Sequence, residues 1–171
     1  MINEAGVDAG FHTCACSCPG ATVWFTGLSG SADLDLVLDL VLDLVLVLDL
    51  AEQLRARGRR VVVLDADDTD VADESRHPLP GKRLTPRHLG VVAEVLARNG
   101  VITLIRAPSS ATESREAARR RHEASDTAYL EVELVGPESH QQPTGSDLRL
   151  EIGSASSAAV CTLLAERGVV R

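Results

Sequence analysis

Ala21-Thr-Val-Trp-Phe-Thr-Gly27-Leu28-Ser29-Gly30-Ser31 is the segment from which the fold class of this chain follows. Its first six residues are apolar, aromatic or β-branched, and they predict a buried strand over residues 21–26. Glycines and serines come next, and a glycine-rich turn after a strand is typical of a phosphate-binding loop. Backbone amides at the start of the following helix would bind the anion. The predicted nucleotide-binding residues are Gly27, Ser29, Gly30 and Ser31.

The continuation of this loop lacks the groups that phosphoryl transfer needs. The pattern G-x-x-x-x-G-K-[ST] supplies a lysine for the β- and γ-phosphates and a hydroxyl for Mg²⁺. Here Ser31 is followed by Ala32, Asp33 and Leu34, and the only lysine of the chain is Lys82. At ~4 Å and an effective dielectric constant of about 20, exchanging attraction for repulsion costs several kcal/mol. We therefore expect nucleotide affinity and catalysis to be impaired or absent.

The composition indicates one globular domain. The chain has 171 residues, of which 44% are hydrophobic but only 2% aromatic, so leucine, valine and alanine must form the core. The net charge of −8 argues against nucleic acid or an anionic membrane as the main partner. No signal peptide is evident, and aspartates interrupt the apolar run at residues 34–50, so we expect a cytoplasmic protein that does not span a membrane.

Residues 1–20 read as a flexible, cysteine-containing leader ahead of a domain at residues 21–171. The cysteines Cys14, Cys16 and Cys18 alternate along this leader, with His12 before them. They are compatible with a metal or redox cluster, although C-x-C spacing is less usual for zinc than C-x₂₋₄-C. The other interpretation is a mobile arm with incidental thiols, and no residue is assigned as a metal ligand.

The low-complexity tract at residues 32–50 has an ambiguous periodicity. Leucine occupies every even position from 34 to 50, as in a strand, whereas Asp35, Asp39 and Asp43 recur every four residues, as on a helix. We predict a helix, because leucine is a strong helix former and the tract continues into residues 51–57. Gly58 is the expected residue after its end.

Strands and helices alternate along the rest of the chain. Buried strands are predicted at residues 60–64, 101–105, 129–134 and 148–152. Helices are predicted from Thr85-Pro86 to Gly100, from a capping box at Ser110–Glu113 to His122, and from Ser154 to Gly168. This order predicts an α/β fold with a parallel sheet flanked by helices on both faces. Residues 27–31, 65–68 and 107–110 would then lie together at the carboxyl ends of the strands.

Four segments of the chain resemble adenylyl-sulfate kinase, a family of P-loop kinases. They are ATVWFTGLSGS, LAEQLRARGRRVVVLDADD, RHLGVVAEVLARNGVITLI and DLRLEIGSASSAAVCTLLAERG. The resemblance implies a P-loop NTPase-type sheet and a family reaction in which ATP and Mg²⁺ phosphorylate the 3′-hydroxyl of adenosine 5′-phosphosulfate. It also implies an adenine nucleotide or adenylyl-sulfate as ligand, and a homodimer or a sulfurylase as partner. Only residues 135–147 occupy the place of the family's substrate-covering lid, so we expect the lid to be missing.

The resemblance assigns roles to individual residues. Asp65 and Asp67 stand where the family has its acidic pair near substrate and metal, which implies a catalytic role, and Arg87 matches a substrate-binding arginine. The alternatives are a strand-to-loop turn for the aspartates and a solvated first helical turn for Arg87. The basic stretch Arg115, Arg119, Arg120, Arg121 and His122 is predicted to be a solvated helix face.

Three functional hypotheses follow. The chain is an impaired or inactive adenylyl-sulfate kinase of sulfate assimilation, a non-catalytic pseudokinase that binds a nucleotide or docks on a partner, or a decayed enzyme scaffold. A gain of ATP binding when the loop lysine is restored would favour a damaged enzyme scaffold.

Overall fold

The computed structural model describes residues 18–26, 35–65, 85–107, 111–135, 145–151 and 156–170. Most of the predicted leader, with Cys14 and Cys16, lies outside the described residues. The same is true of the four loop residues Gly27, Ser29, Gly30 and Ser31, of Asp67, and of most of the segment predicted to lack a lid.

The described chain has five strands and four helices, which alternate except that β5 comes directly after β4. They are β1 (Ala21–Thr26), α1 (Asp35–Ala56), β2 (Arg60–Asp65), α2 (Pro86–Arg98), β3 (Val101–Arg106), α3 (Thr112–Ala124), β4 (Ala128–Val135), β5 (Leu148–Glu151) and α4 (Ser157–Glu166).

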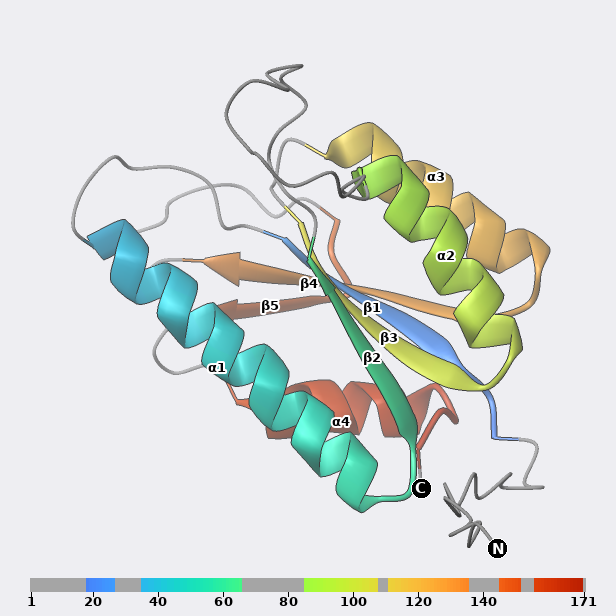
Figure 1. Cartoon of the computed structure of the whole chain (residues 1–171), viewed down its shortest axis with the longest axis horizontal. Helices are drawn as coiled ribbons and strands as arrows, with labels where there is room; N and C mark the ends of the chain where they lie inside the picture. The colour runs from blue at the N-terminus through green and yellow to red at the C-terminus, as the bar shows by residue number, and fades with distance from the viewer. Residues whose placement is uncertain are drawn as a thin grey trace, which may run out of the picture.

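The strands form one sheet in the order β2-β3-β1-β4-β5, and every neighbouring pair is parallel. The helices α1 and α4 cover one face, and α2 and α3 cover the other (Figure 1). The predicted α/β architecture is therefore confirmed. None of the helices in the described ranges is long and apolar enough to cross a membrane.

The two faces of the sheet differ in chemistry because side chains alternate along each strand. Ala21, Val23 and Phe25 of β1 face α1 and α4 within a large aliphatic core. Trp24 faces the other way and packs with Leu89 of α2 in a smaller cluster. That second face also carries polar side chains of β1, β3 and β4, namely Thr22, Thr26, Thr103, Tyr129, Glu131 and Glu133.

The Leu/Asp/Val tract is helical, as predicted, because only a helical period meets the sheet along one stripe. Leu46, Val47, Leu50, Ala51 and Leu54 are buried against the sheet. A neighbouring stripe of the same helix is exposed and apolar, and it consists of Val41, Leu44, Val45 and Leu48. Leucines at even positions are thus divided between core and solvent, so their period of two has no structural meaning here.

Most predicted helix ends are confirmed. Gly58 and Gly100 follow α1 and α2 with φ of 73° and 72°, the left-handed region that favours glycine. The capping box predicted at Ser110–Glu113 is wrong as placed, because the residue preceding α3 is Ala111 and makes no side-chain cap. The last helix begins at Ser157, after the cap Ser156, rather than at Ser154. Neither cap sequence could specify its register, because serines are frequent on both sides.

Gly20 is the tightest backbone contact leading into β1. A Cβ at this position would overlap the carbonyl oxygen of Ala97 and lie 2.7 Å from the carbonyl oxygen of Val101. Both obstacles are main chain, so they cannot rotate away. We expect Gly20→Ala to lower the free energy of unfolding by about 2–3 kcal/mol, measured by urea denaturation.

Gly145→Ala is the control for this prediction. Gly145 has φ of 79°, but a Cβ added there would meet no atom of the described residues within 4 Å. Only the backbone cost of about 1 kcal/mol is therefore expected. Equal losses in the two variants would contradict the packing explanation.

Candidate functional site

The carboxyl ends of the strands are the place where this architecture binds ligands. In open α/β sheets the ligand lies outside these ends, where successive connections turn in opposite directions. Here β1 leads through α1 to β2 on one side, and β3 leads through α3 to β4 on the other. The ends of β1, β2 and β3 come together at the upper end of the sheet in Figure 1. The candidate site is therefore centred on the end of β1.

Two charged residues near this position are Asp65 and Arg106. They end β2 and β3, and they are register partners, while Arg106 also pairs with Phe25 of β1. The Arg106 Nη1 lies 3.2 Å from Asp65 Oδ1 and 3.4 Å from Oδ2. The Arg106 side chain is 10% exposed, whereas that of Asp65 is 61% exposed. Asp65 is one of the site residues predicted from the sequence, whereas Arg106 is not.

This ion pair changes what Asp65 can do. Carboxylate oxygens are suitable ligands for Mg²⁺. In this arrangement, however, both Asp65 oxygens face a guanidinium, which repels a second cation. Across the described ranges, no three His, Cys, Asp or Glu side chains are grouped as metal ligands. At this edge the described residues therefore offer a guanidinium to an anion, and they do not offer a set of ligands to a metal ion.

Arg87 lies in the first turn of α2 and is exposed. No hydrogen bond or ion pair within the described part of the chain joins it to Asp65 or Arg106. Thr85, the predicted cap of this helix, precedes α2 but makes no capping bond, and its hydroxyl lies 2.9 Å from His88 Nδ1. The proposed substrate role of Arg87 remains a prediction.

The basic stretch of α3 is not a uniformly solvated face, and this prediction is wrong for two of its members. Arg115 is 7% exposed and His122 is fully buried, whereas Arg120 and Arg121 are exposed. Arg119 is intermediate. The missed signal was the alternation Glu131-Val-Glu133 within a buried strand, because buried carboxylates require partners.

The partners of these arginines form a network that joins α3, β4 and the segment before β5. Arg115 Nε lies 2.8 Å from Glu131 Oε1, and Arg119 Nη2 lies 3.3 Å from Oε2. Arg119 also reaches Asp147, whose Oδ2 accepts a hydrogen bond from the Glu131 amide at 2.9 Å. Arg167, beyond α4, completes the network with a 3.0 Å contact to Asp147. The network positions β5 and α4 relative to α3.

His122 is buried between α3 and β4. Its Nδ1 lies 2.7 Å from the Thr127 hydroxyl, and its ring centroid is 5.5 Å from that of Tyr129. The guanidinium of Arg119 also lies over the Tyr129 ring, 5.0 Å from its centre. Burial lowers the pKa of His122 to about 4, although Glu94 of α2 opposes the shift. The imidazole is therefore neutral in the folded protein at neutral pH.

This neutral imidazole makes stability depend on pH. The pKa is about 4 when folded and 6.5 when unfolded, so the unfolded chain takes up the proton first. The contribution of neutral His122 to the free energy of unfolding is complete above about pH 6.5. It is lost as the pH falls toward 4, by up to about 3 kcal/mol. Urea denaturation at a series of pH values between 7 and 4.5 should show the free energy of unfolding falling with pH. This fall should be less steep in His122→Gln. The exposed His88 is the control, and an equal effect of His88→Gln would refute the assignment.

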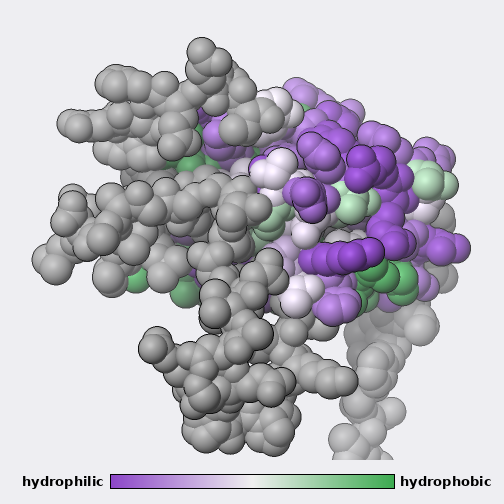
Figure 2. Space-filling view, turned by 90° about the horizontal axis from the view of Figure 1, so that it is seen from above, coloured by the Kyte–Doolittle hydropathy of each residue, from purple (hydrophilic) through white to green (hydrophobic). Residues whose placement is uncertain are grey.

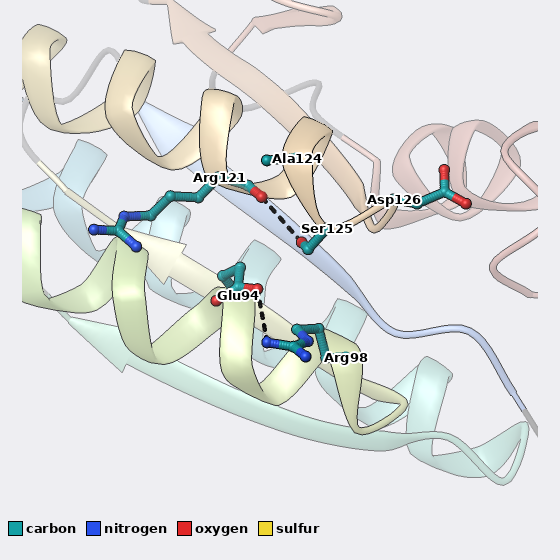
Figure 3. A pocket seen from close by; sticks show the side chains of 6 residues that line it. All are labelled: Glu94, Arg98, Arg121, Ala124, Ser125 and Asp126. Atoms are coloured by element: carbon teal, nitrogen blue, oxygen red, sulfur yellow. Dashed lines mark hydrogen bonds and ion pairs between the residues drawn. The ribbon is translucent and has the colours of Figure 1, made fainter.

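A hollow lies between α2 and α3, with a volume of about 590 Å³. It is lined by Glu94, Arg98, Arg121, Ala124, Ser125 and Asp126, and Figure 3 shows the Asp126 carboxylate turned away from it. The surrounding described surface on this side is mostly hydrophilic (Figure 2). The hollow adjoins the end of α2 and the turn before β4, so it lies at the opposite end of the sheet from Asp65 and Arg106.

Comparison with known proteins gives one family. Residues 19–143 match the model of the family described as adenylylsulphate kinase. The adenylyl-sulfate kinase of Synechococcus sp. strain JA-3-3Ab is 36% identical over 104 residues, which cover 60% of this chain and 53% of that protein. The probable adenylyl-sulfate kinase of Aeropyrum pernix is 30% identical over 122 residues, which cover 70% of this chain and 61% of that protein. The chain thus spans about half the length of the first of these relatives.

Solved structures of kinases share the fold. A structure of the Mycobacterium tuberculosis APS kinase CysC has 27% identity and a TM-score of 0.57, covering 86% of this chain and 96% of that one. The hexameric APS kinase of Thiobacillus denitrificans has a TM-score of 0.60 over 90% of this chain and 30% of its own, at 23% identity. At 23% identity, the likeness to the Thiobacillus denitrificans structure supports the fold alone.

Proposed function

Because the chain belongs to the adenylylsulphate kinase family, we propose that it binds an adenine nucleotide or adenylyl-sulfate at the carboxyl edge of its sheet. We further propose that phosphoryl transfer from ATP to the 3′-hydroxyl of adenosine 5′-phosphosulfate is impaired or absent. The protein acts either as a weakened kinase of sulfate assimilation or as a pseudokinase. A cytoplasmic location and a homodimer or sulfurylase partner are parts of the same proposal.

The observation that carries binding is the position of Arg106 and Asp65 beside the end of β1. The parallel order β2-β3-β1-β4-β5 places β3, with Arg106, directly beside β1, and β2, with Asp65, on the far side of β3; residues 27–31 follow β1 in the sequence. A guanidinium binds phosphate oxygens in a planar, two-bond geometry. The edge therefore offers positive charge to a phosphate group.

The residues that speak against efficient catalysis lie outside the described ranges. Ala32, Asp33 and Leu34 stand in place of the glycine, lysine and serine of the loop pattern. Phosphoryl transfer depends on positioning and on neutralising phosphate charge. The family uses ATP and Mg²⁺, and the loop of this chain supplies neither the lysine nor the hydroxyl at the usual positions.

Calorimetric titration with MgATP, MgADP and adenylyl-sulfate, each separately, tests the proposal. Micromolar binding of any of them supports ligand binding, and a coupled phosphoryl-transfer assay then separates a weakened kinase from a pseudokinase. Binding of all three that is millimolar or weaker would reject both and leave a decayed scaffold.

Restoring the loop pattern should strengthen nucleotide binding. We expect Ala32→Gly/Asp33→Lys/Leu34→Ser to bind MgATP at least about tenfold more tightly than the natural chain, a gain of about 1.4 kcal/mol. The matched control carries Asp33→Met with the same two neighbouring changes, so that it removes the aspartate without adding a lysine. If both variants gained equally, the lysine would have no part in the effect.

A further inference from the structure

Arg106 has surroundings that differ from those of Arg115, the other buried arginine of the described residues. Arg115 faces the buried carboxylate of Glu131 at 2.8 Å. Arg106 is about as buried, yet its carboxylate partner, Asp65, is 61% exposed at the sheet edge. The Nε of Arg106 is buried, and within the described part of the chain nothing accepts its hydrogen bond. A buried donor without an acceptor destabilises the fold.

The side chain also lies on a particular face of the sheet. Ile102 and Leu104 of β3 face α1 and α4, and alternation places Arg106 on the same face. Val61 and Val63 of β2 also face α1 and α4, so the same alternation places Asp65 on this face. This is the face of α1, the helix that follows β1 in the chain. Since Arg106 is also the register partner of Phe25, its charge stands beside the end of β1.

Arg106 is the only basic residue among those that end the five described strands. The others are Thr26, Asp65, Val135 and Glu151. The sequence puts Asp33 at the loop position where a lysine would meet phosphates. A phosphate group at the end of β1 would therefore find its positive charge on β3.

We propose that Arg106 is an anion-binding residue that takes a phosphate group of a polyphosphate or nucleotide, and that Asp65 is an internal competitor which the phosphate displaces. The proposal rests on the proposed function, because it assigns the cation of that same site. The exposed Asp65 carboxylate can turn into water at small cost, since partly exposed ion pairs contribute little to stability. A phosphate carries more charge than the carboxylate, and it can accept from Nε and a terminal nitrogen together.

Displacement predicts an effect of opposite sign for the two residues. The probe is inorganic pyrophosphate in EDTA, titrated calorimetrically into the natural chain, Asp65→Asn, Arg106→Gln and the double variant. We expect Asp65→Asn to tighten pyrophosphate binding about fivefold, because the phosphate no longer has to displace Asp65 from Arg106. Fivefold corresponds to about 1 kcal/mol. Arg106→Gln should abolish binding, and the double variant should behave like Arg106→Gln.

Matched controls separate this from general charge effects. Glu151→Gln removes a negative charge from the same sheet edge, and Arg98→Gln removes an exposed positive charge from α2. Neither should change pyrophosphate affinity by more than about twofold, given screening at moderate salt. Arg106→Lys keeps the charge and should retain part of the binding, which guards against loss of fold as the cause.

The proposal is overturned if Asp65→Asn weakens binding or leaves it unchanged, or if the double variant binds as tightly as Asp65→Asn. Failure of the proposed function can be distinguished from failure of this proposal. Pyrophosphate binding that depends on Arg106, together with no binding of MgATP or adenylyl-sulfate, would reject the nucleotide function and keep the anion site. Tight MgATP binding that Arg106→Gln does not alter would keep the function and reject the role of Arg106.

Discussion

Arg115→Met is expected to lower the free energy of unfolding by about 3–5 kcal/mol, because removing one partner of a buried ion pair leaves the other charge buried without compensation. The side chains of Arg115 and Glu131 are 8% and 10% exposed, and their atoms approach to 2.8 Å. Methionine keeps the length of the side chain, and the only arginine that it leaves beside Glu131 in the described part of the chain is the more distant Arg119, at 3.3 Å. Urea denaturation at pH 7 measures the loss.

Two comparisons make this prediction specific. Arg120→Met removes an exposed arginine from the same helix and should change stability by no more than about 0.5 kcal/mol. Arg115→Met combined with Glu131→Leu removes both charges, and it should recover much of the loss, because a buried pair is often replaceable by apolar residues. Failure of the double variant to recover would mean that the destabilisation comes from lost packing.

Trp24→Ala should destabilise the protein by about 3–5 kcal/mol, as large-to-small changes of buried aromatic residues do. The indole is fully buried between the sheet and α2, where it packs with Leu89, Ala93 and Ile105. Its ring centroid is 6.5 Å from that of Tyr129. Circular dichroism should follow the unfolding, because Trp24 is the only tryptophan and the variant loses that fluorescence.

Trp24→Phe is the informative partner variant. The indole N–H has no acceptor among the described residues, so phenylalanine removes a buried donor as well as some volume. We expect a loss below about 1.5 kcal/mol. A loss as large as that of Trp24→Ala would show that the indole nitrogen makes a bond that stabilises the fold.

The fold was predictable because its signals are local and repeated. Residues 21–26, 60–65 and 101–106 are short apolar runs bounded by glycine or by loops, and helical patterns separate them. Such alternation permits few arrangements other than a parallel sheet covered on both faces. The tract at residues 35–50 was ambiguous in isolation, and continuity with residues 51–56 decided it correctly.

The candidate site was predictable only in part. Asp65 carried a motif and a position after a strand, so its place at the sheet edge followed from the sequence. Arg106 belonged to no motif, and only the pairing of β3 between β2 and β1 gave it Asp65 and Phe25 as neighbours. The burial of Arg115 and His122 was missed for a related reason, since both face Glu131 or Tyr129 on a strand that follows them in the chain.

The amino-acid sequence by itself determined the element order, the parallel α/β class, the family and the absence of a lysine from the loop. These properties depend on residue type and on spacing over a few positions. The tertiary structure alone decided which charges are buried, which carboxylate each arginine meets and which cation stands beside β1. Those pairings join residues distant in the chain, and their energies depend on desolvation, which exists only once the helices are packed on the sheet.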